Sequence, residues 1–195
     1  MKRAIVMFSL FSGMLLVPPT IPTVSQAAFA DEDKTPDVVY VPTPNDIVAE
    51  MLKLAKVKKS DVVYDLGCGD GRIVVTAARK YGCKGIGFDI DPKRLAESNA
   101  NVKKYKVGKL VQIKDEDIFK VDLSKASVIT LYLLPSLNKR LVKQFNKMKP
   151  GSRIVSHEYD IKGIKPDKTL HFKSREDGQS HTIYLWTVPL KSEKK

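Results

Sequence analysis

A glycine-rich segment, Asp65-Leu66-Gly67-Cys68-Gly69-Asp70-Gly71, is the stretch of this 195-residue sequence whose residue types and spacing best suit ligand binding. It overlaps the end of the β-branched and aromatic run Val62–Leu66, and an amphipathic helical pattern begins after it at Arg72. Glycine is needed where a backbone turns sharply or where a ligand approaches the main chain closely. A strand that runs through such a turn into a helix is the context in which glycine motifs of this kind bind nucleotides.

The spacing of the glycines separates two classes of nucleotide site. Dinucleotide-binding turns have the pattern G-x-G-x-x-G, with the pyrophosphate at the helix N-terminus. Here the spacing is Gly67-x-Gly69-x-Gly71, and Arg72 stands where the third glycine would fall. A bulky arginine disfavours close packing around a pyrophosphate, and the sequence has no G-x-x-x-x-G-K-[ST] phosphate loop. An NAD-dependent oxidoreductase is therefore disfavoured.

Acidic residues follow the next two predicted strands. Asp89 ends the second strand and can accept hydrogen bonds from both hydroxyls of a ribose. After the third strand, Asp117-Ile118 places a carboxylate beside an apolar side chain, a pair that can contact the edge and the face of an adenine. Each feature alone also has a simpler interpretation, a helix start before Pro92 for the first and a solvated loop for the second.

Alternating strands and helices would position these segments. A helix is predicted to start at Thr43-Pro44, where a capping hydroxyl precedes proline in the first helical position. Strands that alternate with helices indicate a parallel sheet covered on both faces, and two late strands without a helix between them indicate an antiparallel edge. We therefore predict an α/β fold, a Rossmann-like, doubly wound, mostly parallel seven-stranded sheet with an antiparallel C-terminal edge. The expected strands are 62–66, 85–90, 110–113, 127–133, 153–156, 170–173 and 181–188. Four helices are expected, and the residues that face inward are, helix by helix, Ile47, Val48, Met51, Leu52 and Ala55; Ile73, Val74, Ala77, Ala78 and Tyr81; Leu95, Ala96, Asn99 and Val102; and Leu137, Leu141, Val142, Phe145 and Met148. The last of these helices is expected to end at Pro150-Gly151.

The ordered set of motifs resembles the class I, seven-β-strand methyltransferases, which use S-adenosylmethionine (SAM). Asp65–Gly71 resembles their first motif, Asp89 their second-strand acid and Asp117-Ile118 their adenine-contacting pair. The match spans residues 38–188, and the resemblance implies an enzyme with one methyltransferase domain over residues 40–190 and SAM as its cofactor. It implies cofactor contacts from Asp65, Gly67, Cys68, Gly69, Gly71, Asp89, Ile90, Asp117 and Ile118.

Three further segments are similar to one subgroup of that family. They are Tyr40-Val41-Pro42-Thr43-Pro44, Asp70-Gly71-Arg72-Ile73 and Leu131-Tyr132-Leu133-Leu134-Pro135. The subgroup contains small bacterial and archaeal methyltransferases and mitochondrial protein-lysine methyltransferases. The resemblance implies that Tyr40 and Thr43 lie over the cofactor, that Tyr132 lies near the acceptor, and that the acceptor is a protein lysine. The Asn/Asp-Pro-Pro-Tyr/Phe signature of enzymes that methylate adenine or glutamine amide nitrogens is absent, which counts against those acceptors.

Methyl transfer is an in-line displacement, so the protein's main tasks are alignment and the exclusion of water. A lysine acceptor must be neutral to attack; a dry pocket favours that form, and an aromatic face can hold the cation beforehand. Tyr132 is the predicted catalytic residue in this sense, although packing at a strand end would also explain it. Glu158 and Tyr159 are further candidates for the acceptor pocket.

No metal site is predicted. His157 and Glu158 are adjacent on a strand, and adjacent strand residues point to opposite faces of the sheet. His171 and His181 lie in the late strands and are interpreted as structural.

Two other functional classes stay open beside a protein-lysine methyltransferase. One is a small-molecule methyltransferase of the same fold, and the other is a non-catalytic nucleoside-binding module.

The first thirty residues differ from the rest. Lys2 and Arg3 precede a 14-residue apolar run, Ala4–Val17, and an A-x-A site follows at Ala28-Phe29-Ala30. This pattern is typical of a secretory signal peptide, and a membrane span needs about 20 residues. We expect a signal over residues 1–30, a linker over 31–39, a basic tail over 191–195, and an exported, periplasmic or secreted protein. An uncleaved membrane anchor is the alternative, and no stable membrane span is expected after cleavage.

Charge and cysteine content narrow the possible partners and chemistry. The formal net charge is +12, which fits either a soluble charged surface or attraction to an acidic partner. Aromatic residues are not interleaved with the basic clusters, so nucleic acid binding is not indicated, and nothing points to an oligomeric state. Cys68 follows the end of the first strand and Cys83 precedes the second, so they should lie roughly 17 Å apart. A disulfide needs Cα atoms within about 7 Å, and two free thiols are therefore predicted.

Overall fold

The structure, a computed structural model, describes residues 40–193. The predicted signal (1–30), the predicted linker (31–39) and the last two residues of the predicted tail lie outside the described residues. Within 40–193, no helix has the length and apolar character that crossing a membrane requires.

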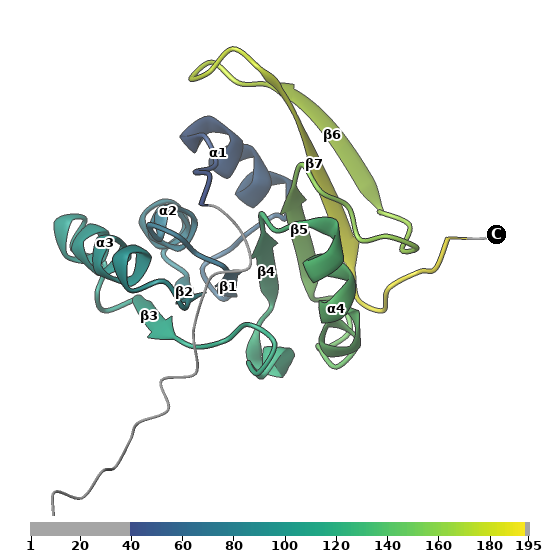
Figure 1. Cartoon of the computed structure of the whole chain (residues 1–195), viewed down its shortest axis with the longest axis horizontal. Helices are drawn as coiled ribbons and strands as arrows, with labels where there is room; N and C mark the ends of the chain where they lie inside the picture. Colours follow the sequence, from purple (N-terminus) through teal and green to yellow (C-terminus); the bar gives the residue numbers. More distant parts are fainter. Residues whose placement is uncertain (1–39, 194–195) are drawn as a thin grey trace, which may run out of the picture. The chain divides into compact units, whose positions relative to one another are not determined.

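A seven-stranded sheet forms the centre of the described chain, in the order β3-β2-β1-β4-β5-β7-β6 (Figure 1). The first five strands pair in parallel, whereas β7 is antiparallel to both β5 and β6. The predicted fold class is therefore confirmed, including the antiparallel C-terminal edge. The strands are β1 (Val62–Leu66), β2 (Lys84–Asp89), β3 (Val111–Asp115), β4 (Val128–Leu131), β5 (Arg153–His157), β6 (Lys168–Lys173) and β7 (Ser180–Thr187).

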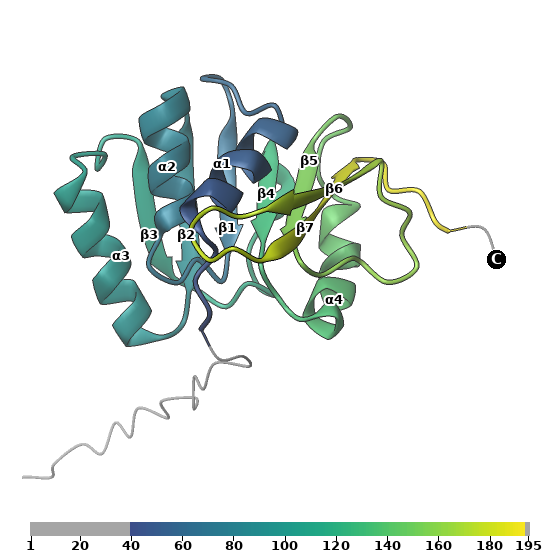
Figure 2. The same ribbon diagram turned by 90° about the horizontal axis from the view of Figure 1, so that it is seen from above.

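Helices cover both faces of this sheet (Figures 1 and 2). One face carries α1 (Asn45–Leu54), α2 (Arg72–Tyr81) and α3 (Pro92–Lys104), and the other carries α4 (Pro135–Phe145). A short 3-10 helix, η1 (Leu123–Lys125), precedes β4 and contacts α4. Because both faces are covered, the central strands β1, β4 and β5 are buried along almost their whole length rather than on alternate residues.

Alternate residues of the central strands supply two separate cores, since successive side chains on a strand point to opposite faces. The core below α1 and α2 contains Val63, Val128 and Val155, and the core below α4 contains Tyr64, Ile129 and Ile154. The predicted inward faces of α1 and α2 are confirmed, with Tyr81 only partly buried.

The start of α1 differs from the prediction. Pro44, not Thr43, occupies the cap position, and no side chain caps the helix. The Thr43 hydroxyl instead contacts Nδ1 of His157 at 3.2 Å. A local capping motif is therefore the wrong interpretation of Thr43, because a partner 114 residues away in sequence competes for its hydroxyl.

The predicted inward face of α3 is wrong in part. Leu95 and Val102 are partly buried, as predicted, but Ala96 and Asn99 are exposed. The fully buried residue of the helix is Ser98. Close packing on the glycine turn explains this choice, because a Cβ at Gly71 would lie 3.0 Å from Cβ of Ser98. A small side chain is required there, and this requirement overrides the weak apolar pattern of the helix.

Two elements are shorter than predicted. β4 ends at Leu131, so Tyr132 and Leu133 belong to the loop after it, and α4 ends at Phe145 rather than at Pro150. Met148 is nevertheless buried in the turns that follow α4. Apolar residues beyond an element's end continue its pattern whenever they still face the core, which is why the pattern overestimates length.

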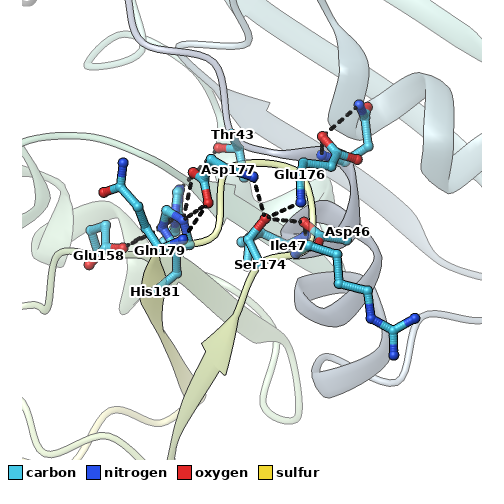
Figure 3. A network of polar contacts seen from close by, with 12 residues as sticks. Thr43, Asp46, Ile47, Glu158, Ser174, Glu176, Asp177, Gln179 and His181 are labelled. Carbon is cyan, nitrogen blue, oxygen red and sulfur yellow. Dashed lines mark hydrogen bonds and ion pairs between the residues drawn. The ribbon is translucent and has the colours of Figure 1, made fainter.

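The turn of the β6–β7 hairpin packs against the start of α1 (Figure 3). Asp46 accepts hydrogen bonds from the Ser174 hydroxyl at 2.9 Å and from the Arg175 backbone N–H at 2.7 Å. Glu176 accepts from the backbone N–H of Asn45 at 2.9 Å. The hairpin is thereby fastened beside the segment that leads into α1, a contact that the sequence did not predict.

Candidate active site

A cleft opens where the carboxyl ends of β1, β2 and β4 meet. The chain moves outward from β1 to β3 in one direction and from β4 onward in the other, so β1 and β4 border a topological switch point. Ligands of open α/β sheets bind at such a point. The cleft is lined by Tyr40, Val41, Pro42, Thr43, Asp65, Gly67, Cys68, Asp70, Arg72, Ile73, Asp89, Ile90, Asp91, Arg94, Glu116, Asp117, Ile118, Phe119, Tyr132, Leu133 and Leu137.

The structure brings most of the predicted site residues into this one cleft. Tyr40, Thr43, Asp65, Gly67, Cys68, Asp89, Ile90, Asp117, Ile118 and Tyr132 all line it. Gly69 and Gly71 do not line it and instead shape the turn beneath it. Both have positive φ values, 54° and 74°, in the left-handed region that glycine tolerates best.

Gly69 also makes room for an aromatic ring. A Cβ at this position would lie 2.1 Å from the ring of Tyr40, a distance that real atoms cannot reach. The absence of a side chain therefore allows the Tyr40 ring to pack directly against the turn. The guanidinium of Arg94 stacks on the Tyr40 ring, 4.4 Å from its centroid.

Arg72 fastens the segment before α1 to the turn. Its Nη2 forms an ion pair with Asp70 at 2.8 Å, and its Nη1 donates to the Thr43 carbonyl at 2.8 Å. This positioning role of Arg72 was not predicted: the residue counted against a pyrophosphate site and belonged to a segment similar to the methyltransferase subgroup. The Asp70-x-Arg72 pattern was the signal that could have indicated the role. Burial acts to raise the pKa of Asp70, but the bonds from Arg72 outweigh it and hold that pKa below its ordinary value.

Asp65, in β1, has one unpaired buried oxygen. Its Oδ1 accepts a hydrogen bond from the Thr130 hydroxyl at 2.6 Å, but Oδ2 has no hydrogen-bond partner among the described residues. Burial raises the pKa of Asp65 to about 7; the Thr130 bond opposes the rise, and Asp89 and Asp70 add to it. A cationic group in the cleft would satisfy the free oxygen and favour the ionised carboxylate.

Asp89, at the end of β2, has a carboxylate held by three backbone donors. Oδ2 accepts from Gly69 N at 2.8 Å, and Oδ1 accepts from Ile90 N at 2.8 Å and from Asp91 N at 3.0 Å. A carboxylate offers about four acceptor positions, two on each oxygen, so one position remains free, on Oδ2. The carboxylate is thus fixed in orientation at the cleft and can still receive a hydroxyl donor.

The loop after β3 contributes the predicted adenine pair. Asp117 accepts a hydrogen bond from Phe119 N at 2.9 Å, which forms a tight turn and presents Ile118 to the cleft. The guanidinium of Arg140 lies 3.6 Å from the centroid of the Phe119 ring and braces the loop from α4. The arrangement offers an acidic edge beside an apolar wall, as predicted.

Aromatic rings gather at the end of the cleft next to β4 and β5. The Tyr132 ring lies 4.2 Å from the His157 ring and is stacked on Tyr159 with 6.0 Å between centroids. Burial raises the pKa of the Tyr132 hydroxyl, with smaller contributions from Tyr159 and Glu158. Tyr132 and Tyr159, both singled out from the sequence, therefore stand side by side.

Two histidines and a glutamate converge beside this aromatic end. His157 Nε2 lies 3.0 Å from His181 Nδ1, which in turn lies 2.7 Å from Glu158 Oε1. The prediction that His157 and Glu158 point apart is wrong, because Glu158 has a φ of 60° and its backbone leaves the strand geometry. His181, interpreted as structural, joins the same cluster. No sequence pattern indicated this convergence, since His157 and His181 are 24 residues apart.

Comparisons with known proteins agree with this geometry. The family model of the ANTKMT methyltransferase domain matches residues 65–168. A protein-lysine N-methyltransferase from Saccharolobus islandicus is 43% identical over 78% of this chain and 95% of its own length. An ATP synthase lysine N-methyltransferase of Xenopus laevis is 26% identical, over 66% of this chain and 56% of its own length, so this chain spans about half of the vertebrate relative. Among solved structures, an RNA methyltransferase from Salinibacter ruber in complex with S-adenosyl-L-homocysteine has 43% identity and a TM-score of 0.71, covering 80% of this chain and 98% of that one.

The residues of the cleft fit SAM. The free Oδ2 of Asp65 suits the ammonium of the methionine part, the oriented carboxylate of Asp89 suits the ribose hydroxyls, and Asp117-Ile118 suits the adenine. When bound, this cofactor supplies a methyl group on a positively charged sulfur. The geometry of the cleft agrees with the matched family model and with the 43% identity to the archaeal protein-lysine N-methyltransferase. The chain belongs to the ANTKMT methyltransferase domain family and is a SAM-dependent methyltransferase.

Proposed function

We propose that this enzyme N-methylates lysine side chains of proteins. Two relatives carry names of that activity, the archaeal protein-lysine N-methyltransferase and the vertebrate ATP synthase lysine N-methyltransferase. The observation that carries the proposal is the aromatic end of the cleft, where Tyr132 lines the cavity with Tyr159 stacked beside it. Tyrosine faces attract an ammonium group, and the effect is stronger where water is excluded.

The charge of the cleft also favours a cationic acceptor. Its lining contains six acidic residues, Asp65, Asp70, Asp89, Asp91, Glu116 and Asp117, but only two basic ones, Arg72 and Arg94. Both arginines are already paired, Arg72 with Asp70 and Arg94 with Glu97 at 2.7 Å. A lysine would therefore approach a cleft of opposite charge.

Asp65, Asp89 and Tyr132 have different tasks in the transfer of the methyl group to lysine. The acceptor lysine approaches as a cation and must then lose its proton to solvent, because only the neutral amine can attack; a water-poor cleft favours that neutral form. With SAM bound, attack by the nitrogen lone pair on the methyl group would form the N–C bond as the C–S bond breaks, which would give a methylammonium and S-adenosylhomocysteine. The protein's contribution is to align the two reactants, with Asp65 and Asp89 holding the cofactor and Tyr132 the amine.

RNA is the second candidate acceptor, because the Salinibacter ruber protein is described as an RNA methyltransferase at the same 43% identity. The net charge of +12 would suit a polyanion on the outer surface. The acidic lining of the cleft opposes it, since phosphates would be repelled at the point of transfer. The observations therefore favour lysine.

The two acceptors can be separated in one experiment. The purified full chain is incubated with methyl-labelled SAM and either a protein extract or total RNA, and the products are hydrolysed and analysed. We expect label in methyl-lysine and none in RNA. A Tyr132→Phe variant should keep most of the activity because it keeps the aromatic face, and Tyr132→Ala should lose it while still binding SAM.

Label recovered in nucleosides, with none in methyl-lysine, would overturn the proposal. Equal activity of Tyr132→Ala and the unsubstituted enzyme on protein would leave lysine methylation in place but remove Tyr132 from it.

A further inference from the structure

Three potential metal-ligand atoms, from His157, Glu158 and His181, lie close together beside the aromatic end of the cleft. His157 Nε2 and His181 Nδ1 are 3.0 Å apart, His181 Nδ1 and Glu158 Oε1 are 2.7 Å apart, and His157 Nε2 and Glu158 Oε1 are 3.5 Å apart. His157 ends β5 and His181 lies at the start of β7, its antiparallel neighbour in the sheet. The two histidines are therefore held by paired strands of the central sheet rather than by surface loops.

The backbone of Glu158 is bent to bring its carboxylate into this set. Glu158 has a φ of 60°, and Tyr159 N donates to His157 O at 2.7 Å across it. This is a three-residue turn of the rare and strained γ type. Such conformations cluster at functional sites. Figure 3 shows Glu158 directed at His181 as a result.

Hydrogen bonding alone does not satisfy the three atoms. Nδ1 of a histidine has either one proton or one lone pair. It cannot use either one fully toward both His157 Nε2 and Glu158 Oε1, although both are within hydrogen-bond distance. A cation that accepts a lone pair from each atom removes the conflict. A point about 2.1 Å from all three exists beside their plane, and zinc lies about 2.0–2.2 Å from nitrogen and oxygen ligands.

The outer contacts of the two histidines are those of metal ligands. His157 contacts the Thr43 hydroxyl through its other nitrogen at 3.2 Å, and His181 contacts Asp177 through Nε2 at 3.0 Å. Metal-binding histidines almost always donate their second N–H to such a partner, which fixes the tautomer and the ring orientation. Asp177 is drawn with His181 in Figure 3.

We propose that His157, Glu158 and His181 bind one divalent transition-metal ion of the zinc class. Two imidazoles and one carboxylate suit zinc and cobalt(II), whereas magnesium and calcium prefer oxygen ligands alone. Both rings are almost fully buried, and the Glu158 side chain, 30% exposed, gives the ion a path from solvent. None of the three ligands is among the predicted cofactor contacts, and the proposal goes beyond lysine methylation.

The ion would connect two parts of the acceptor region. Its ligand His157 lies against the ring of Tyr132, and His181 lies on the hairpin that is fastened to α1. Bound metal would fix the hairpin and the aromatic end of the cleft in one arrangement.

Metal binding can be measured without any assay of activity. The full chain, without a histidine tag and stripped with a chelator, is titrated with cobalt(II) by visible absorption and dialysed against zinc for elemental analysis. We expect one ion per chain, and none with magnesium. The matched control is His171→Ala, which removes an exposed histidine of β6 that contacts Thr182 outside the cluster.

The ligand variants decide the outcome. His181→Ala and Glu158→Gln should lose the bound ion, and Asp177→Asn should weaken binding by roughly 10- to 100-fold. Glu158→Gln keeps the shape of the side chain, so it serves if His181→Ala fails to fold. An unsubstituted chain that retains no zinc, or variants that retain as much as His171→Ala, would overturn the proposal.

Discussion

At the scale of single residues, the two acids that resemble cofactor ligands have opposite environments. Asp89 accepts three backbone hydrogen bonds, whereas Asp65 is buried with one oxygen unpaired among the residues that the structure describes. The sequence could place both at strand ends because that depends on local pattern. It could not give their hydrogen-bond partners, since Thr130 belongs to a strand 65 residues away from Asp65.

Replacing Asp89 should strongly weaken SAM binding. Asp89→Ala removes the free acceptor position offered to the ribose, and a hydrogen bond to a charged group contributes about 1.5–3 kcal/mol. We expect the Kd for SAM, measured by isothermal titration calorimetry, to rise by roughly 10- to 100-fold. Asp122→Ala is the control, because that acid caps η1 away from the cleft. An unchanged Kd in Asp89→Ala would remove the ribose assignment.

The charge state of Asp65 should make SAM binding depend on pH. Its pKa of about 7 in the free protein lies above the ordinary value, so the carboxyl is mostly neutral at pH 6 and mostly ionised at pH 8. Only the ionised form attracts the cofactor's ammonium, and affinity should therefore increase by about tenfold between those two values.

The raised pKa of Asp65 has the opposite effect on the stability of the cofactor-free chain, which should decrease rather than increase with pH. The folded protein holds the Asp65 proton up to a higher pH than the unfolded chain, so this residue's contribution to stability falls as pH rises toward 7. Asp65→Asn should flatten the pH dependence of the Kd. If the unsubstituted protein binds SAM equally at pH 6 and pH 8, the pairing of Asp65 with an ammonium is incorrect.

At the scale of elements, the glycine turn and the segment before α1 act as one unit. Gly69 provides the space, Tyr40 fills it, and Arg72 fixes the segment through the Thr43 carbonyl. The unit explains why Gly69 and Gly71 belong to the site without lining it.

Filling the space at Gly69 should displace Tyr40. Gly69→Ala places a methyl group within 2.1 Å of the ring and should weaken SAM binding as well as lower the melting temperature. A residue with a side chain in the left-handed region costs roughly 1–2 kcal/mol by itself. Gly163→Ala measures that cost alone, since Gly163 has a φ of 84° and nothing within 4 Å of its added Cβ.

The melting temperature should therefore fall further in Gly69→Ala than in Gly163→Ala, and the difference measures the clash of the added methyl group with Tyr40. Adding Tyr40→Ala to Gly69→Ala should recover part of the lost stability. Equal melting temperatures for the two glycine variants would show that Tyr40 does not lie on the turn in solution.

The elements themselves were largely predictable from the sequence, with instructive exceptions. β1 and the inward faces of α1 and α2 follow from local apolar patterns, which are strong there. The burial of Ser98 was not predictable from the residues of α3 alone, because the close packing of Ser98 on Gly71 causes it. The histidine cluster was not predictable either, because one residue's φ at Glu158 decides it and contradicts the strand pattern.

At the scale of the whole molecule, charge is divided between the cleft and the rest of the chain. The cleft lining is acidic, yet the chain carries a net charge of +12. A basic exterior can attract an acidic partner over several ångströms while the acidic cleft selects a cationic side chain at contact. A lysine in an otherwise acidic protein segment would suit both the basic exterior and the acidic cleft.

We further propose that residues 1–30 act as a cleaved export signal, based on the basic start, the short apolar run and the Ala28-Phe29-Ala30 site. Intact mass measurement of the protein from its native cell should then give a chain that begins at Asp31. A mass that includes residues 1–30 would favour the uncleaved anchor instead.

An exported enzyme would meet oxidising conditions, and the fold predicts how its two cysteines behave there. Cys68 and Cys83 are both free and buried. Cys68 follows the carboxyl end of β1 and Cys83 precedes the amino end of β2, so they lie at opposite ends of two neighbouring parallel strands. Burial raises the pKa of both thiols, so neither forms the reactive thiolate readily. We expect thiol labelling of the native protein to be slow and labelling after unfolding without reductant to give two thiols per chain. Fewer than two in the unfolded monomer would mean that the cysteines had paired, which this strand order does not allow without a rearranged sheet.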